Sequence, residues 1–425
     1  MHRPSTPTGK LMILLPGMGA VATTFMAGVM LARRGLAPPI GSLTQLGHVG
    51  DTGVRLADYV PLAALDDLDF AGWDIFPDTA LEAARHAQVL SNEHLALAAP
   101  ELDAIHPMRA AFYPEYVTRL SGPHVKWTSS KAAMVERLRE DVRTSMARTG
   151  ATRAVAIWCG STEVHQTLSP VHASISAFEA GLRADAPEIS NAQLYAWACV
   201  KERIPFANGS PNVAVDFPAI WELARDHRVP LAGKDFKTGQ TLVKTILAPG
   251  LKSRLLGVRG WYSTNILGNR DGEVLDDPEA FRAKEASKLG VLETIFDAEE
   301  NPELYRDLVH KVRIDYYPPR GDAKEGWDNV DLSGWLDYPM QLKVNILCRD
   351  SILAAPLVLD TALFLDLAQR AGMFGIQDWL GFYFKAPMPL PGEQRVHALH
   401  EQHRALFDEL GRIRNASASA AAPAA

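Results

Sequence analysis

Cysteine is scarce in this chain of 425 residues, which contains Cys159, Cys199 and Cys348 and no others. No two of them form a C-x-x-C pair, so a structural zinc site is not indicated. A sparse, odd set of cysteines is also typical of a reduced, cytosolic protein, because disulfide frameworks use dense and even sets. We therefore expect a cytoplasmic protein.

The chain also lacks an excess of positive charge and any long apolar run. Its 43 lysines and arginines against 50 aspartates and glutamates give a net charge of -7, which argues against nucleic acid or an anionic membrane as a partner. No uninterrupted apolar run reaches the roughly 18 residues of a membrane span, and residues 1–10 have no apolar core of a signal peptide. A local basic pocket stays possible within this acidic average.

A glycine-rich turn follows the first apolar run. Gly17, Gly19 and Ala22 fit the pattern G-x-G-x-x-A between an expected strand and an expected helix. Missing side chains let the backbone approach a diphosphate, so this turn favours a dinucleotide cofactor. The acid expected about 20 residues later is displaced, because Asp51 lies in a glycine-rich stretch and Asp74 comes later. The nucleotide-binding part therefore carries an insertion or uses another residue.

Strand-like and helix-like segments alternate along the rest of the chain. Strand-like runs end in small polar residues and precede helical segments, which favours an α/β fold with a mainly parallel sheet. Residues 242–352 are different, since their alternating, aromatic-rich segments are typical of an antiparallel or mixed sheet. We predict a discontinuous Rossmann-like domain at residues 10–241 and 353–415, an inserted α+β domain at residues 242–352, and disordered tails at residues 1–9 and 416–425.

Four lysines lie in settings that suit catalysis. Lys284 and Lys288 would share one face of a helix, although this segment by itself favours a solvated face over a shared anion. Lys324 follows a turn, and Lys385 lies between aromatic residues and a proline. Apolar surroundings lower the pKa of a lysine and suit it to proton transfer, but a surface lysine with a buried stem is the alternative for each.

The segment "GKDFKTGQT", residues 233–241, carries a run of small hydrogen-bonding groups able to hold a phosphate or polyol, or to form an ordinary polar loop. Together with "GWDI", "PFANGSP", "LGNRDG", "FRAKEASK", "GDAK", "RDSILAAPL" and "FKAP", it resembles the myo-inositol-1-phosphate synthase family. The ordered set extends from the glycine turn to Lys385. This resemblance makes Lys284 and Lys288 candidate site residues.

The resemblance implies NAD-dependent conversion of D-glucose 6-phosphate into 1L-myo-inositol 1-phosphate. In the family, C5 is oxidised, a C6 proton is removed, the enolate closes onto C1, and C5 is reduced again. A phosphate dianion and several developing oxyanions need positive charge in a dry site, which explains why an acidic protein would gather lysines. The resemblance also implies a sugar phosphate as substrate, a homotetramer formed through the inserted catalytic domain, and a monovalent or divalent cation as an open possibility.

The family's functional positions carry over onto matching residues of this chain. Lys284 would assist proton removal from the C5 hydroxyl, Lys385 would support the C1 and enolate oxygens, and the other two lysines would hold phosphate and developing charge. The expected catalytic residues are Lys284, Lys288, Lys324, Lys385, Asp235 and Asp322; the expected substrate-binding residues are Thr238, Gly239, Gln240, Thr241, Asn269 and Asp271; and the expected cofactor-binding residues are Gly17, Gly19, Ala20, Val21, Ala22, Asp74, Thr162, Asp350 and Ser351.

Several positions depart from the family pattern. Arg270 stands where an asparagine is usual, Lys234 where an aspartate is usual, and Arg349 where an acid is usual. The segment "GMGAVATT" also lacks the glycine and two asparagines that many members have there. Arg270 and Lys234 leave open a cyclase of another phosphorylated sugar. A non-catalytic NAD-binding relative is a further alternative, against which the four retained lysines speak.

Overall fold

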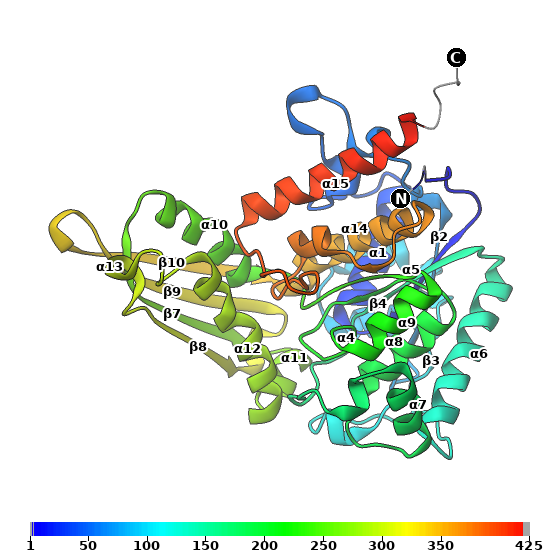
Figure 1. Cartoon of the computed structure of the whole chain (residues 1–425). Coiled ribbons are helices and arrows are strands. Elements are labelled where there is room, and N and C mark those ends of the chain that lie inside the picture. The colour runs from blue at the N-terminus through cyan, green and yellow to red at the C-terminus, as the bar shows by residue number, and fades with distance from the viewer. Residues whose placement is uncertain (1, 3, 420–425) are drawn as a thin grey trace.

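The computed structural model describes residues 2 and 4–419, except for the side chains at positions 51, 271, 280–281, 283–289 and 417–419. Figure 1 shows a larger lobe, which is built on a wound sheet between helices, and a smaller, elongated lobe that projects from it. The two lobes contain separate sheets, one of seven strands and one of four. The side chains of Lys284, Lys288 and Asp271 lie outside the described part of the chain, so their expected positions stay predictions.

The larger lobe contains a parallel sheet with the strand order β11-β6-β5-β4-β1-β2-β3. Every neighbouring pair in it is parallel, and the order reverses between β1 and β4. This is the Rossmann arrangement with one additional edge strand, so the predicted fold class is confirmed. The strands are β1 Leu11–Pro16, β2 Leu68–Asp74, β3 Met108–Arg109, β4 Arg153–Trp158, β5 Phe206–Asn208, β6 Pro230–Gly233 and β11 Gly375–Ile376.

Helices cover both faces of this sheet, which explains why β1 is apolar at every position. Ile13 and Leu15 pack in one core cluster, and Met12 and Leu14 pack in the other. The first face is covered by α1 Ala20–Arg33, α4 Ala80–Ala87, α5 Asn92–Asp103, α14 Asp350–Arg370 and α15 Leu399–Ser419, and the second by α6 Lys131–Thr149, α7 Ile175–Arg183, α8 Asn191–Lys201 and α9 Pro218–His227.

An insertion at residues 34–67 separates α1 from β2 and includes α2 Leu43–Leu46 and α3 Leu56–Tyr59. It is attached to α14 by the buried Asp360 carboxylate, which accepts hydrogen bonds from Ser42 Oγ at 2.6 Å and from the Thr44 hydroxyl at 2.6 Å. The insertion accounts for the displaced acid. Asp74 ends β2, the neighbour of β1, whereas position 51 lies within the insertion.

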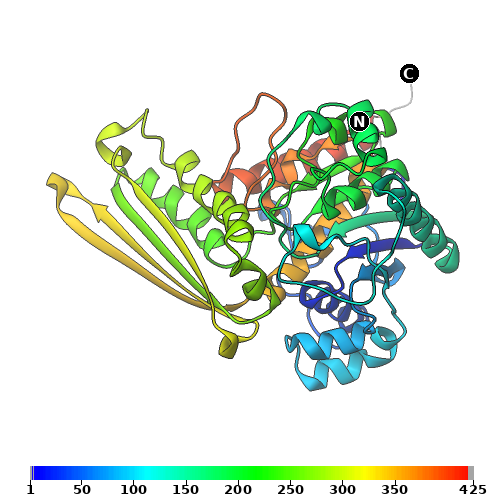
Figure 2. The ribbon, with the colours of Figure 1, turned by 90° about the horizontal axis from the view of Figure 1, so that it is seen from below.

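The smaller lobe contains a mixed sheet, one of the two kinds that the sequence indicated, and its strand order is β10-β9-β7-β8. Only the pair β7 and β8 is parallel. Figure 2 shows this sheet extending away from the larger lobe with helices along one face. That face is apolar and packs residues of α10 and α12 against Trp261 and Val330. The elements are β7 Gly257–Leu267, β8 Val309–Tyr316, β9 Ala323–Ser333, β10 Pro339–Arg349, α10 Gly239–Ser253, α11 Arg270–Leu275, α12 Pro278–Ile295 and α13 Pro302–Tyr305.

The predicted domain limits coincide with continuous helices. The limit at 241/242 falls inside α10 and the limit at 352/353 falls inside α14, so each helix extends across it. The predicted C-terminal tail begins at 416, but α15 continues to Ser419. At the other end, the His2 N–H donates to the Ala371 carbonyl at 3.0 Å.

Helix α14 is long and apolar enough to cross a membrane by length and composition. However, 72% of its most apolar window is buried inside the protein, as in the core helix of a folded domain. It packs against α1 and β4 and contributes Leu363 and Phe364 to the core. We therefore assign α14 to the core.

Candidate active site

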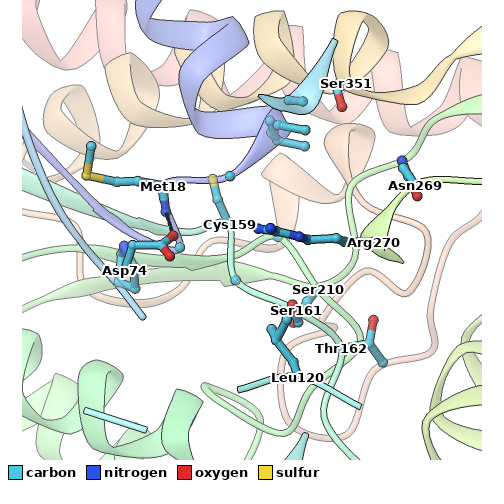
Figure 3. A pocket seen from close by; sticks show the side chains of 18 of the residues that line it. Met18, Asp74, Leu120, Cys159, Ser161, Thr162, Ser210, Asn269, Arg270 and Ser351 are labelled. Carbon is cyan, nitrogen blue, oxygen red and sulfur yellow. Dashed lines mark hydrogen bonds between the residues drawn. The ribbon is translucent and has the colours of Figure 1, made fainter. Parts of the chain in front are cut away.

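A cavity of about 580 Å³ lies at the carboxyl ends of the parallel strands, where ligands collect in open α/β sheets. Its wall combines the residues that follow β1, β2, β4, β5 and β6 with α11, the start of α14 and the segment before β9. Figure 3 shows Met18, Asp74 and Thr162 from the larger lobe around the same space as Asn269 and Arg270 from the smaller lobe. Both lobes thus contribute to one site.

The glycine turn has the geometry that a dinucleotide requires. Gly17 has φ +88°, and a Cβ on it would lie 2.5 Å from the Gly160 Cα, so only glycine fits there. Gly19 caps α1 without a side-chain hydrogen bond, and nothing lies within 4 Å of where its Cβ would be. Free N–H groups and the positive end of the helix dipole therefore face open space, which suits a diphosphate. Ala20 and Val21 line the cavity as expected.

Ala22 has a different position, because it is fully buried in the core between α1 and the sheet. It fits the third position of the motif, where a small residue permits close packing of helix and strand. Its contribution to the cofactor site is thus through packing.

Asp74 holds the glycine turn from the end of β2. Its Oδ2 accepts a hydrogen bond from the Met18 N–H at 2.8 Å, and its Oδ1 accepts one from the Phe76 N–H at 3.0 Å. Burial raises the pKa of the Asp74 carboxyl, although both N–H groups oppose the shift. Asp74 lines the cavity at the place where the acid of a Rossmann fold meets the adenosine ribose.

Lys385 and Asp235 form a buried ion pair in the cavity wall. The Lys385 Nζ lies 3.1 Å from Asp235 Oδ1, and the side chains of both residues are less than 5% exposed. Their backbones also meet, because the Lys385 N–H donates to the Asp235 carbonyl at 2.6 Å. Asp235 therefore fixes the ammonium group where the cavity ends.

Lys324 and Asp350 form a second pair, with 2.9 Å between Nζ and Oδ2. Burial by itself raises the pKa of the Asp350 carboxyl, but the Lys324 and Lys385 ammonium groups outweigh it and hold that pKa well below its usual range. Lys324 does not line the cavity itself and reaches it through Asp350.

Asp322 lies beside this pair and has the opposite shift. Burial raises the pKa of the Asp322 carboxyl, and the nearby Asp350 raises it further. Its Oδ1 accepts hydrogen bonds from Ser351 Oγ at 2.9 Å and from Asn269 Nδ2 at 3.3 Å. This network joins α14 to the start of α11, so three expected site residues support one another.

The segment Thr238–Thr241 divides between the cavity and the interior. Thr238 lines the cavity at the start of α10. Gln240 instead donates from Nε2 to the Thr264 carbonyl at 2.9 Å and to the Trp327 carbonyl at 3.1 Å, which anchors α10 to the four-stranded sheet. Gly239, Gln240 and Thr241 are not part of the described cavity wall, and their assignment to substrate stays a prediction.

Helix α12, which carries positions 284 and 288, is connected to the Lys385 segment by His397. The His397 ring bonds the Lys385 carbonyl through Nε2 at 3.1 Å and the Thr294 hydroxyl through Nδ1 at 2.6 Å. Burial lowers the pKa of His397 to about 4, so the ring is neutral at physiological pH. Thr294 belongs to α12, and the helix is therefore attached close to Lys385.

Of the expected residues, those that the described cavity wall contains are Gly17, Gly19, Ala20, Val21, Asp74, Thr162, Asp235, Thr238, Asn269, Asp322, Asp350, Ser351 and Lys385.

Glu163 is a cavity residue that the sequence did not indicate. It is 1% exposed, and its Oε1 accepts a hydrogen bond from the Ala192 N–H at the start of α8 at 2.9 Å. Burial raises its pKa to about 7. It directly follows Thr162, an expected cofactor residue in the segment after β4, but an acid in such a segment is ordinarily solvated. Only its burial distinguishes it.

Three basic residues depart from the family pattern, and Lys234, Arg349 and Arg270 lie in different surroundings. Lys234 pairs with Asp216, with 2.7 Å between Nζ and Oδ2, and is not part of the described cavity wall. Arg349 donates from Nη2 to the Gln88 carbonyl at 2.6 Å at the end of α4. Only Arg270 lines the cavity.

Comparison with known proteins gives consistent results along the whole chain. A family model described as myo-inositol-1-phosphate synthase matches residues 11–410. Inositol-3-phosphate synthase 1 of Bacteroides thetaiotaomicron is 52% identical over 402 residues, which cover 93% of this chain and 94% of that protein. The human protein of the same name is 33% identical over 433 residues, covering 92% and 76%. The crystal structure of inositol-3-phosphate synthase from Caenorhabditis elegans superposes with a TM-score of 0.90 at 26% identity, covering 97% of this chain and 87% of that one.

The match extends over both lobes and includes the glycine turn, the two lysine–aspartate pairs and helix α12. The chain belongs to the myo-inositol-1-phosphate synthase family.

Proposed function

We propose that this protein is an inositol-3-phosphate synthase, which converts D-glucose 6-phosphate into 1L-myo-inositol 1-phosphate. The observation that carries this proposal is one cavity that combines a dinucleotide-type glycine turn with the buried Lys385–Asp235 pair and with Asp350, which Lys324 contacts from outside the cavity wall. A redox cofactor and fixed ammonium groups are what an oxidation, an enolisation and an aldol closure need in one place.

NAD is the cofactor in this proposal. The turn at Gly17 and Gly19 with the start of α1 would hold its diphosphate, and Asp74 would hold its adenosine ribose. When bound, NAD supplies a hydride acceptor for C5 of the sugar and returns the hydride at the end, so no external reductant is consumed. Thr162 and Ser351 would line the remaining part of the cofactor site.

Lys385 would stabilise the oxygens of the substrate that become negative. Because Asp235 contacts its Nζ in a buried setting, the lysine is held in place before the substrate arrives. A charge in a dry, preorganised site stabilises a developing oxyanion far more than the same charge in water. Lys385 would thus support the enolate and the C1 alkoxide, and Asp322 would orient the neighbouring groups through Ser351 and Asn269.

Lys284 and Lys288 would complete the site from α12, and Lys324, which reaches the cavity through Asp350, would add positive charge near the phosphate that Lys288 holds. The support for this proposal is the attachment of α12 to the Lys385 segment through His397, together with the family match over residues 11–410, a range that includes "FRAKEASK". Lys284 would take the proton of the C5 hydroxyl as C5 is oxidised.

D-Glucose 6-phosphate is preferred here over another phosphorylated sugar. The two positions that motivated a different substrate were Lys234 and Arg270. Lys234 is paired with Asp216 away from the described cavity wall, so it does not bear on substrate choice. Arg270 lies beside Phe76 and His86 at the end of the cavity near β2, on the side of the cofactor.

A cation, if the reaction uses one, would fit beside Asp322 and Ser351. The Asp322 Oδ2 atom is buried and has no hydrogen-bond partner, and carboxylate and hydroxyl oxygens are ligands that hard cations prefer. Arg349 lies 3.9 Å from the same oxygen, and it would take over part of the role of such a cation. The described residues contain no cluster of three or more histidine, cysteine, aspartate or glutamate side chains, which disfavours a zinc-type site.

A homotetramer and a cytoplasmic location complete the proposal. The outer face of the four-stranded sheet exposes large apolar side chains, including Tyr262, Trp327 and Leu347, which opposing strands place on one face. Contiguous exposed apolar residues mark association surfaces, so copies of the smaller lobe would pair here. The cysteines are free, which agrees with a reducing compartment.

The test is incubation of the purified protein with D-glucose 6-phosphate and NAD, followed by assay for inositol phosphate. Product should accumulate without added NADH and far beyond the amount of NAD present. Product that appears only with stoichiometric NADH would refute the internal redox cycle. The variant Lys385→Met serves as the inactive control.

A further inference from the structure

The cofactor end of the cavity contains an arginine that comes from the smaller lobe. Arg270 begins α11, and its guanidinium carbon lies 4.4 Å from the centre of the Phe76 ring. Its Nη2 donates to His86 Nε2 of α4 at 2.9 Å. Figure 3 shows the side chain extending from the Asn269 side of the cavity toward Met18 and Asp74. Arg270 thus spans the cavity between the lobes.

Its guanidinium lies near the groups that face the adenosine half of a dinucleotide. Phe76 comes two residues after Asp74, the acid at the ribose position. The Asp74 carboxylate contacts the glycine turn through the Met18 N–H, and Arg270 is close enough to lower the pKa of that carboxyl against the larger effect of burial. Arg270, the ribose acid and the diphosphate turn therefore belong to one neighbourhood.

The cavity wall contains few cationic side chains, and Arg270 is one of them. Arg270 and Lys385 are the lysine and arginine residues in the described wall, and Lys385 is paired with Asp235. The helix dipole of α1 contributes only about half an elementary charge. A dinucleotide brings two negative charges or more into this cavity. The acidic residues of the wall are Asp74, Asp78, Glu163, Asp235, Glu273, Asp322 and Asp350.

We propose that Arg270 is a phosphate-binding residue of the cofactor site, whose guanidinium donates to phosphate oxygens on the adenosine half of the dinucleotide. A planar guanidinium suits this task, because it binds phosphate through two parallel hydrogen bonds and stacks on aromatic rings such as Phe76. Two phosphates meet this description, the diphosphate of NAD and the 2′-phosphate of NADP, and the ligands chosen below separate them. The inference rests on the proposed use of a dinucleotide.

Titration calorimetry with adenosine, 5′-ADP and 2′,5′-ADP tests the proposal on the full chain. Arg270→Asn should weaken binding of a phosphorylated ligand roughly 10- to 100-fold, the range of a charge-assisted hydrogen bond, and leave adenosine within about twofold. Arg270→Lys should recover part of the loss, and added salt should shrink it. A loss with 5′-ADP assigns Arg270 to the diphosphate, and a loss confined to 2′,5′-ADP assigns it to the 2′-phosphate.

Arg119→Asn is the matched control. Arg119 also connects the lobes at α11, with 3.1 Å between its Nη1 and Asp276 Oδ2, but it is not part of the described cavity wall. The control should bind all three ligands as the parent does. An equal loss in Arg119→Asn would show that Arg270 acts by anchoring α11 and would overturn the proposal.

Three other outcomes also overturn it. Equal losses for adenosine and 5′-ADP would show that Arg270 supports the base or the fold, and unchanged affinities for all three ligands would show that it touches none of them. A parent protein that binds neither 5′-ADP nor NAD would refute the proposed NAD dependence as well. In contrast, a parent that binds NAD and forms inositol phosphate, with an Arg270→Asn variant of unchanged affinity, refutes this inference alone.

Discussion

Replacing Glu163 by glutamine should stabilise the protein, and the gain should grow with pH. Glu163 belongs to the cavity wall but is buried, and burial raises the pKa of its carboxyl from 4.5 to about 7. Because the folded-state pKa lies above the unfolded one, the folded protein binds the proton more tightly. The contribution of Glu163 to stability is therefore most favourable below pH 4.5 and is lost as the pH rises toward 7.

The size of the stability gain in Glu163→Gln follows from the pKa shift of the Glu163 carboxyl. Each pKa unit corresponds to about 1.4 kcal/mol, so the shift of Glu163 amounts to about 3 kcal/mol once the pH exceeds 7. Glutamine is neutral at every pH, has nearly the same shape, and keeps an oxygen that accepts from the Ala192 N–H. Glu163→Gln should thus equal the parent near pH 4.5 and exceed it by about 3 kcal/mol at pH 8.

Urea unfolding followed by tryptophan fluorescence, in steps from pH 5 to 8 without cofactor, measures this difference. Glu202→Gln is a suitable control, since Glu202 caps the C-terminal end of α8, the helix whose first turn donates the Ala192 N–H to Glu163. Burial raises the pKa of the Glu202 carboxyl, but Arg143 and Arg139 outweigh burial and lower it, so its stabilisation is present above the unfolded pKa. Glu202→Gln should therefore be less stable than the parent by a nearly constant amount from pH 5 to 8, because this whole range lies above the unfolded pKa of 4.5. A Glu163→Gln gain that is constant from pH 5 to 8, or that falls with pH, would refute the assignment of a raised pKa.

The remaining predictions concern activity and ligand affinity. Lys284→Ala should lower the rate by at least about two orders of magnitude with an unchanged circular dichroism spectrum, the usual scale for an acid–base group; near-normal activity would return this lysine to a solvated surface. Lys288→Ala and Lys324→Ala should weaken a substrate analogue that keeps its phosphate, more at low salt than at high salt, and leave an analogue without phosphate unaffected in calorimetry. Equal losses for both analogues would assign these lysines to the sugar or the fold. Lys234→Met should keep kcat/KM for D-glucose 6-phosphate within about threefold, because Lys234 faces Asp216, and a larger loss would restore it as a determinant of the substrate.

Much of the fold could be predicted because its signals are local. Gly17 has a positive φ and a close backbone neighbour that other residues do not permit, and it follows an apolar run and precedes a helix, so strand, turn and helix were recognisable from residues 11–33. The continuous apolar character of β1 reflects burial on both faces and favoured a parallel sheet. The mixed sheet of the smaller lobe was likewise recognisable, because alternation of side chains follows from strand geometry.

For the site, the sequence predicted which residues take part, but not which of them contact one another. From the sequence by itself, a dinucleotide turn and four candidate lysines could be predicted. Only the tertiary structure decided that Lys385 meets Asp235, that Lys324 meets Asp350, and that Lys234 meets Asp216.

The burial of Glu163 and the reach of Arg270 across the cavity were equally absent from the local pattern. The physical reason is the separation along the chain of the residues that interact. Turns and the alternation of side chains in strands depend on neighbours within a few residues, whereas an ion pair or a shifted pKa depends on which distant segments pack together. Asp235 and Lys385 are 150 positions apart in the chain and come together only because β6 and the segment after α14 lie side by side.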